Sequence, residues 1–412
     1  MPLARFSGLI SLIGGTAGAQ AITLASLIVL TRLYSAPAYG AYAATLAFAA
    51  MAGPVLALRY ETAILMPKRQ QQARLLLGLS LVLAAVFALA GVAAGLISFV
   101  FAPQLTAAIL WVTAASVLIL YELVALAWLN REGRYRTIGA IAVTKALAIA
   151  GFQIALYREP RGLFIGFLAG SATLALILSV LLAAELRRVL AEFSLKRGRA
   201  LLWRYRDFPK FSFPAAALNL MGTNLPVVLI RALLGETIAG YFAMVNRVLM
   251  AAPVLFGGNI NRIYNKKLRD AINAGRSVLP LTRRYFALGA GIALAVFLGG
   301  ALLYVLDGFV LLLGSDWAAA NDYIIPLLAV AAVAIASTSV SRFAYLGRND
   351  IGLYYQAAYL MASVVSLYAG YRLLGNPVYI VAAYSGTICL VLSAQVLTVM
   401  STAGAIDRKS PR

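Results

Sequence analysis

Apolar runs recur along the whole chain and are separated by short polar breaks. A run of about 20 residues forms a helix long enough to cross the hydrocarbon core of a membrane. The breaks predict spanning helices at 8–30, 39–66, 75–99, 107–129, 138–157, 163–184, 211–231, 239–263, 285–306, 321–341, 353–373 and 378–400. The pattern therefore predicts an all-α integral membrane protein with about 12 transmembrane helices.

The longest polar break lies between the first six and the last six predicted helices. From Glu185 to Lys210, apolar residues such as Leu190 and Trp203 stand among cations, as is typical of an amphipathic helix on the inner membrane surface. We expect an N-terminal lobe (1–184), a cytoplasmic linker (185–210), a C-terminal lobe (211–400) and a cytoplasmic tail (401–412). Since an even number of spans separates the lobes, we expect them to be related by a pseudo-two-fold axis along the membrane normal.

The distribution of lysine and arginine predicts the orientation. Of the 35 cations, 27 lie in alternate breaks starting at the N-terminus, and 5 lie in the opposite set. Cationic loops stay on the cytoplasmic side, so both termini are expected in the cytoplasm. The net charge of +21 is explained by this topology and by contact with anionic lipids. No nucleic acid partner is expected, because the cations are spread over several short loops and no aromatic-basic RNA motif accompanies them.

Composition restricts the possible chemistry. With 62% hydrophobic and 12% charged residues, the chain has too much apolar surface for a soluble globule. It contains no histidine, and Cys389, its one cysteine, lies in an apolar run. Disulfides and metal sites built from cysteine or histidine are therefore excluded. We expect no metal, no cofactor and no catalytic residue.

Five charged residues fall inside the predicted spans: Arg59, Glu61, Glu122, Lys145 and Arg247. A charge at the bilayer centre costs about 2.5 to 3.5 kcal/mol on insertion scales, so such residues face protein or a watery cavity. One interpretation is a structural network in which Lys145 neutralises Glu122, and Arg59 or a neighbour neutralises Glu61. The other is an inward-facing cationic site whose carboxylates take up protons. Arg59 and Glu61 are two positions apart, so on one helix they would point in different directions.

Arg247 lies deeper than an arginine at a helix end, and we interpret it as a cavity residue. A guanidinium stays protonated when desolvated and its forked donors suit a diphosphate. Gln20 and Asn219 place an amide near the middle of helices one and seven, and Asn224 is a further amide on helix seven. Pro214, Pro226, Pro253 and the pair Gly257-Gly258 make helices seven and eight candidates for bending.

Short motifs in both halves carry a family resemblance. The N-terminal half has Thr31-Arg32-Leu33-Tyr34-Ser35, Tyr39-Gly40 and Leu58-Arg59-Tyr60-Glu61 followed by Ala63-Ile64 and Pro67. The C-terminal half has Asp207-Phe208-Pro209-Lys210-Phe211, Pro214, Asn219, Leu225-Pro226, Gly240-Tyr241 and Arg247-Val248-Leu249 with Pro253. In order and spacing, over nearly all of the chain, they resemble the bacterial polysaccharide biosynthesis (Wzx-type) flippase family of the multidrug/oligosaccharidyl-lipid/polysaccharide exporter superfamily.

The resemblance implies a V-shaped pair of six-helix lobes around a central cavity, as in multidrug (MATE) exporters. It also implies transport of undecaprenyl-diphosphate-linked oligosaccharide repeat units from the cytoplasmic to the periplasmic leaflet of the bacterial inner membrane, by alternating access, for O-antigen, capsule or exopolysaccharide synthesis. Arg59, Arg247 and Lys145 would bind the diphosphate, with Gln20, Asn219 and Asn224 near the sugars. Since the chain has no histidine, coupling to protons or another ion would have to use Glu61 or Glu122, and the membrane potential acting on the anionic substrate is an equally open driving force. Implied partners are the lipid-linked glycan, membrane lipids, and a polysaccharide polymerase with its chain-length machinery.

Two other classes of membrane protein share some of these features. A multidrug cation exporter of the same superfamily is expected to place a carboxylate in its N-lobe cavity, and helix one has none. A membrane glycosyltransferase or polymerase usually needs an acidic metal motif or a long external loop, whereas the longest outer segment, Asp307 to Asn321, is short. The sequence therefore favours a transporter over an enzyme.

Overall fold

The computed structural model describes residues 2–56, 58–341, 343 and 348–409, and every regular element within these ranges is a helix. Close contacts group the chain into two compact units. Unit 1 comprises the chain up to Tyr34 together with Tyr42–Val228, and unit 2 comprises Ser35–Ala41 and the chain from Leu229 onwards. The segment Ser35–Ala41 thus packs with the C-terminal half although it lies near the N-terminus.

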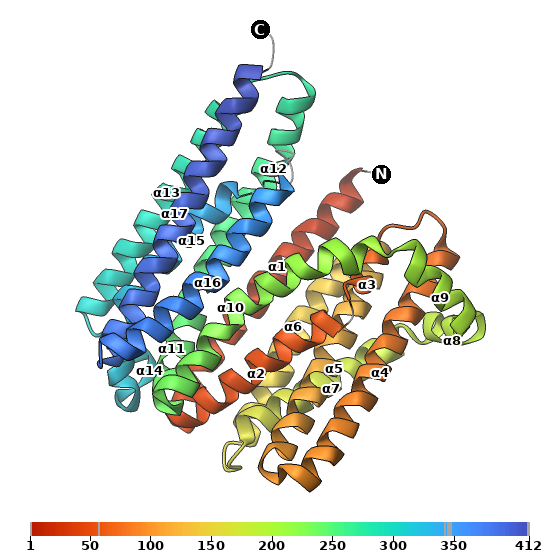
Figure 1. The fold of residues 1–412 in the computed structure, drawn as a ribbon, viewed down its shortest axis with the longest axis horizontal. Coiled ribbons are helices and arrows are strands. Elements are labelled where there is room, and N and C mark those ends of the chain that lie inside the picture. The colour runs from red at the N-terminus through yellow and green to blue at the C-terminus, as the bar shows by residue number, and fades with distance from the viewer. Residues whose placement is uncertain (1, 57, 342, 344–347, 410–412) are drawn as a thin grey trace. The chain divides into compact units, whose positions relative to one another are not determined.

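Unit 1 is built on pairs of long helices (Figure 1). Its elements are α1 (Pro2–Leu33), most of α2 (Ala36–Leu56), α3 (Tyr60–Ala63), α4 (Gln70–Phe101), α5 (Pro103–Arg131), α6 (Tyr135–Ala155), α7 (Gly162–Leu181), α8 (Ala183–Glu192), α9 (Leu195–Arg204), the π-helical η1 (Phe208–Ser212) and most of α10 (Phe213–Leu234). Helix α6 packs between α1 and α7, and α4 packs along α5. Small residues permit this close approach, since a Cβ on Gly15 would meet the backbone of Gly139 across the α1–α6 contact.

Unit 2 is arranged around α15 (Ile324–Val340), which packs against α13 and α17 and lies deepest in the unit. The other elements are α11 (Glu236–Leu249), the π-helical η2 (Pro253–Gly257), α12 (Gly258–Asn273), α13 (Leu279–Val305), α14 (Gly308–Leu313), the 3-10 helix η3 (Ser315–Tyr323), α16 (Asn349–Leu373) and α17 (Pro377–Lys409). Figure 1 shows α13, α15, α16 and α17 as long neighbouring helices. Because α15 has neighbours on several sides, it can be apolar nearly all round.

The predicted fold class is confirmed: each predicted span coincides with helix, and within the described ranges ten helices are long and apolar enough to cross a membrane. The protein is a multi-pass membrane protein. Helices α2 and α16 occupy the two remaining predicted spans. The predicted span 39–66 is wrong in that the helix is interrupted between α2 and α3. The predicted span 239–263 ends too early, since the helix continues to Asn273 through η2 and α12. The lobe boundaries and the cytoplasmic placement of the termini stay predictions, although α17 extends into the proposed tail.

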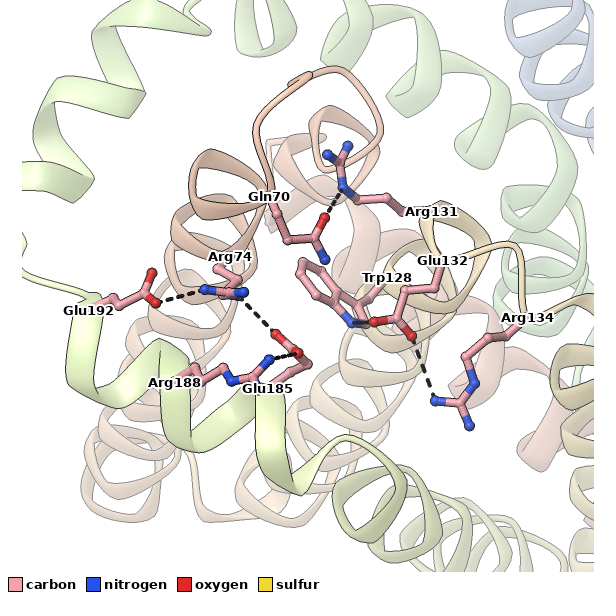
Figure 2. A network of polar contacts seen from close by, with 9 residues as sticks. All are labelled: Gln70, Arg74, Trp128, Arg131, Glu132, Arg134, Glu185, Arg188 and Glu192. Carbon is pink, nitrogen blue, oxygen red and sulfur yellow. Dashed lines mark hydrogen bonds and ion pairs between the residues drawn. The ribbon is translucent and has the colours of Figure 1, made fainter.

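The predicted amphipathic linker forms α8 and α9, and both helices pack against α4. Figure 2 shows the ion pairs between Arg74 on α4 and α8. Arg74 on α4 binds Glu185 Oε2 at 3.0 Å and Glu192 Oε1 at 2.8 Å, so one guanidinium holds both carboxylates of α8. Val189 and Leu201 are buried in the core of unit 1, while Leu190 is 82% exposed. The linker is therefore a docked pair of helices with its acidic groups turned towards the protein.

Two glycines bring the first turn of α2 against α11 within unit 2. A Cβ on Gly40 would collide with the backbone oxygen of Glu236, and one on Gly240 with the backbone oxygen of Ala36. Tyr39 supports the contact by packing edge-on against Trp317, and both rings are almost fully buried. The contact thus depends on both positions lacking a side chain.

We expect Gly40→Val or Gly240→Val to reduce folded protein strongly, because either side chain forces two backbones apart. Overpacking in a rigid interior costs on the order of 1–3 kcal/mol or more. Thermal unfolding in detergent measures the effect, and Gly291→Ala on α13, where a Cβ meets nothing within 4 Å, is the control. Wild-type melting of both valine variants would contradict the contact.

Candidate functional site

The break between α2 and α3 places Arg59 and Glu61 at a distorted turn. Leu58 and Arg59 have φ of 49° and 66°, a left-handed conformation that is unusual for residues other than glycine and often marks functional sites. Packing holds the turn in place: Tyr60 is 1% exposed and its hydroxyl donates to the Leu202 carbonyl at 3.1 Å. Arg131 donates to the Ile64 carbonyl at 3.1 Å on the other side.

The turn makes Arg59 and Glu61 a pair, which corrects the expectation that they point in different directions. Arg59 NH1 lies 3.2 Å from Glu61 Oε1, and the two side chains are 31% and 3% exposed. The reason is that the left-handed residues end the regular helix, so helical spacing no longer applies. Among the described residues, neither oxygen of Glu61 nor Nε of Arg59 has a hydrogen-bond partner, although all three atoms are buried. This carboxylate is therefore poorly compensated, which is costly in a buried site.

Glu122 on α5 and Lys145 on α6 form the second ion pair. Lys145 Nζ lies 2.9 Å and 2.6 Å from the two carboxylate oxygens, so the contact is bidentate. Lys145 is ten residues from the start of α6, which is about 15 Å along the axis and near the middle of the helix. The side chains remain 32% and 16% exposed, so the pair borders open space.

The remaining candidates lie on separate helices. Arg247 is half-buried on α11, eleven residues from its start, while Phe242, Met244 and Val245 are buried in unit 2. Gln20 is half-buried on α1, and Asn219 is exposed on α10. Asn224 donates to the Leu220 carbonyl of its own helix at 2.9 Å. The structure therefore joins four of the eight predicted site residues in two ion pairs and places Arg247 and the three amides on other helices.

Sequence reasoning missed one basic surface, which we call the α12 basic face: Arg262, Asn265, Lys266 and Arg269. These residues lie one helical turn apart and line a cavity of about 280 Å³, together with Asp270. The opposite side of α12 is buried, with Tyr264 and Leu268 fully enclosed. The prediction ended this helix at residue 263 and treated the cations as a loop. The signal was present, because buried and charged residues alternate here with helical periodicity.

The π-helix η2 joins Arg247 to the α12 basic face. It begins at Pro253 and ends at Gly257, where the sequence predicted a bend. Proline removes a backbone hydrogen bond, and π-turns are found mostly within longer helices and frequently at functional sites. As a result, α11, η2 and α12 form one nearly continuous stretch from Glu236 to Asn273. Arg247 and Arg262 lie fifteen residues apart on it, about 22 Å along the axis.

No group of three or more Cys, Asp or Glu residues placed to hold a metal ion occurs among the described residues. The charged groups of the candidate site are instead dominated by arginine and lysine. Such groups bind phosphate-bearing or carboxylate ligands through charge-assisted hydrogen bonds. These cationic groups are suited to holding an anion. The two carboxylates of the candidate site are Glu61 and Glu122.

Comparison with known proteins identifies the fold. No family model and no curated protein sequence matches the chain. Among solved structures, the lipid II flippase MurJ in an inward closed conformation aligns with a TM-score of 0.70 and 13% identity, covering 97% of this chain and 90% of the other. The MATE multidrug transporter DinF-BH aligns with a TM-score of 0.61 and 14% identity, over 97% and 95% of the two chains. A Vibrio cholerae MATE transporter, VcmN, gives 0.59 and 14%, over 97% and 96%.

The fold is that of the MurJ and MATE transporters. This confirms the predicted MATE-like fold class, which both lipid flippases and drug exporters share. The narrower assignment to the Wzx-type family stays a prediction, because identities of 13–14% establish the fold alone. The choice between substrates therefore depends on the residues of the site.

The Glu122–Lys145 pair can be tested for a structural and a functional part separately. We expect Glu122→Met or Lys145→Met alone to lower the amount of folded protein, because each variant leaves one charge without its partner. Removing one partner of a buried ion pair costs about 3–5 kcal/mol, and the cost is smaller where the pair is partly exposed, as here. The double variant Glu122→Met/Lys145→Met should recover folding, as measured by fluorescence-detected size exclusion and melting.

The exchange variant Glu122→Lys/Lys145→Glu distinguishes a ligand role, because it keeps the pair and moves the cation to α5. If Lys145 contacts substrate, this variant folds but transports poorly. Full transport by the exchange variant would show that the pair serves only to hold α5 and α6 together.

Proposed function

We propose that this protein is a flippase that moves undecaprenyl-diphosphate-linked oligosaccharide repeat units across the bacterial inner membrane. Transport would run from the cytoplasmic to the periplasmic leaflet by alternating access, with both termini in the cytoplasm, and would supply surface polysaccharide synthesis. The lipid-linked glycan is the proposed substrate, and a polysaccharide polymerase with its chain-length machinery is a proposed partner. The protein would act as a transporter and not as an enzyme.

The observation that carries this proposal is the cationic track along α11, η2 and α12. Arg247 lies well inside the membrane-spanning stretch, and the α12 basic face lies at its end in a cavity. A diphosphate carries roughly two negative charges and loses its hydration on entering a membrane protein, so it needs charged donors along its path. A substrate headgroup captured at the α12 basic face would have Arg247 as the next cation along the same helix.

Polar groups in unit 1 suit the sugar and the diphosphate as well. Lys145 is partly exposed despite its pairing with Glu122, and Arg59 is 31% exposed beside its buried partner. Gln20, Asn219 and Asn224 supply amides, which both donate and accept hydrogen bonds and thereby match sugar hydroxyls. The similarity of the fold to a lipid II flippase supports a lipid-linked substrate, since that protein is named for moving one.

Export of organic cations is the second candidate, because MATE multidrug transporters share the fold. A cationic drug requires acidic or aromatic groups along its path, whereas α1 contains no acidic residue and the predicted spans hold three cations and two carboxylates. Charge thus favours the anionic substrate.

Glu61 is the proposed proton-coupling residue, in preference to Glu122. Both oxygens of Glu61 are buried without a hydrogen-bond partner among the described residues, whereas Glu122 is neutralised by a bidentate contact with Lys145. A buried carboxylate whose oxygens accept no hydrogen bond can take up a proton without breaking one. Loss of the negative charge would also free Arg59 to bind a phosphate oxygen.

We expect Arg247→Glu to abolish transport, because it replaces the deep cation with an anion that repels the diphosphate. The decisive measurement uses protein reconstituted in vesicles with a fluorescent undecaprenyl diphosphate sugar and a membrane-impermeant quencher. Arg372→Glu, the same charge change on an exposed arginine at the end of α16, is the matched control. In cells, the variant should accumulate lipid-linked glycan on the cytoplasmic leaflet at normal protein level.

The outcomes separate the candidates. Wild-type vesicles that fail to reorient the lipid while extruding an organic cation would replace this proposal with drug export. Undiminished transport by Arg247→Glu would remove that residue from the substrate path.

Glu61→Gln keeps the size of the side chain and removes its titration. We expect wild-type transport to rise when a pH gradient, acid on the periplasmic side, is imposed on the vesicles, and we expect the variant to lose this rise while still responding to a membrane potential. Glu122→Gln, measured in parallel at matched protein level, should retain the response to the gradient. An unchanged gradient response in Glu61→Gln would exclude it as the coupling group.

A further inference from the structure

A second cavity, outside the proposed transport path, lies between the start of α13 and the last turns of α17. Its volume is about 640 Å³, which is within the range of small-ligand sites. Arg283 comes from α13 and Arg408 from α17, with Ser401 between them on α17. Leu279 and Met400 form an apolar part of the wall. The cavity therefore combines two guanidinium groups and a hydroxyl with an apolar side.

Asp407 also lines the cavity, but both oxygens of its carboxylate accept hydrogen bonds from the start of α13. Its Oδ1 accepts from the backbone N–H of Val278 at 2.6 Å, and its Oδ2 accepts from the Ser277 hydroxyl at 2.5 Å and the backbone N–H of Leu279 at 2.9 Å. The carboxylate thus caps the first turn of α13, where the helix dipole favours a negative charge. What remains open towards the cavity is the positive charge of the two exposed arginines.

The cavity is placed where a lipid phosphate would lie. Both α13 and α17 are long and apolar enough to span the membrane, and Arg283 is only four residues from the first residue of α13, about 6 Å along the axis. Of the ten candidate spans among the described residues, α13 has the smallest buried share, 11%, and its Leu294 and Leu298 are each 59% exposed. On α17, Leu397 is 69% exposed one turn from Ser401. An acyl chain could follow this apolar surface while its headgroup occupies the cavity.

From this geometry we propose that the α13–α17 cavity binds the phosphate group of an anionic phospholipid of the surrounding bilayer. The ligand is distinct from the transported molecule, because neither Arg247 nor any residue of the α12 basic face lines this cavity. Two arginines on different helices, bridged by one phosphate, would hold the ends of α13 and α17 together. Arginine suits this role because its fork can make two parallel hydrogen bonds to phosphate oxygens.

The test is lipid binding to the full-length protein, purified in detergent and titrated with phosphatidylglycerol, with phosphatidylcholine as the neutral lipid. Bound lipid is counted by native mass spectrometry. We expect Arg283→Gln/Arg408→Gln to weaken phosphatidylglycerol binding by about tenfold, since a loss of about 1.4 kcal/mol corresponds to that factor. The matched control, Arg276→Gln/Arg284→Gln, removes two exposed arginines from the same region that do not line the cavity, and should change binding less than about twofold.

A second variant tests the cavity without changing its charge. A Cβ on Gly404 makes only an ordinary contact with Leu279 at 3.6 Å, so Gly404→Ala should bind lipid normally, whereas Gly404→Phe should fill the cavity and exclude it. Melting temperatures show whether each variant is folded. Equal loss of binding in both arginine pairs would overturn the proposal, since it would indicate bulk attraction to a basic surface. Displacement of the lipid by millimolar inorganic phosphate would overturn the lipid assignment in favour of a free anion.

Discussion

The low polarity of the bilayer interior is the constraint on which the rest of the structure depends. Charged groups inside it are stable only when they are paired or reach water, and this rule accounts for the intramembrane charges of unit 1. Lys145 makes a bidentate contact with Glu122, and Arg59 lies beside Glu61. At the ends of α4 and α8, Arg74 holds Glu185 and Glu192 in the same way (Figure 2). The cations of the α12 basic face instead line an open cavity.

Irregular backbone lies close to these charges. Two left-handed residues interrupt the helix at Leu58 and Arg59, and the π-helix η2 divides α11 from α12. Each break has a local cost that regular helix would avoid, and each changes the direction in which a charged side chain points. The left-handed residues bring Arg59 close to Glu61. The π-helix η2 lies between Arg247 and the α12 basic face along the chain. Strain and charge are therefore found at the same places in both units.

A fold shared by lipid and drug transporters leaves the choice of cargo to the side chains. The excess of arginine and lysine over carboxylates along the spans favours an anionic ligand, and the amides on α1 and α10 provide groups that suit sugars. In the proposal for the α13–α17 cavity, cations at helix ends bind a bilayer lipid and take no part in transport. Its capping aspartate and apolar wall differ from the α12 basic face, so the two basic surfaces are suited to different ligands.

The approximate number and positions of the long apolar helices follow from the sequence alone, because a span must be apolar over most of its length and the polar breaks are therefore visible. The charges inside the spans were also apparent, since each is expensive in lipid. Tertiary structure decided which of them meet: the turn at Leu58 and Arg59 depends on packing around Tyr60, and the Glu122–Lys145 contact on the alignment of α5 and α6. It also showed that α12 continues as a basic helix past residue 263 and packs against α13 and α15. Hydropathy indicates the free energy of placing a residue in lipid, which is a property of that residue alone. The ion-pair partner of a charged residue depends instead on contacts between segments far apart in the chain.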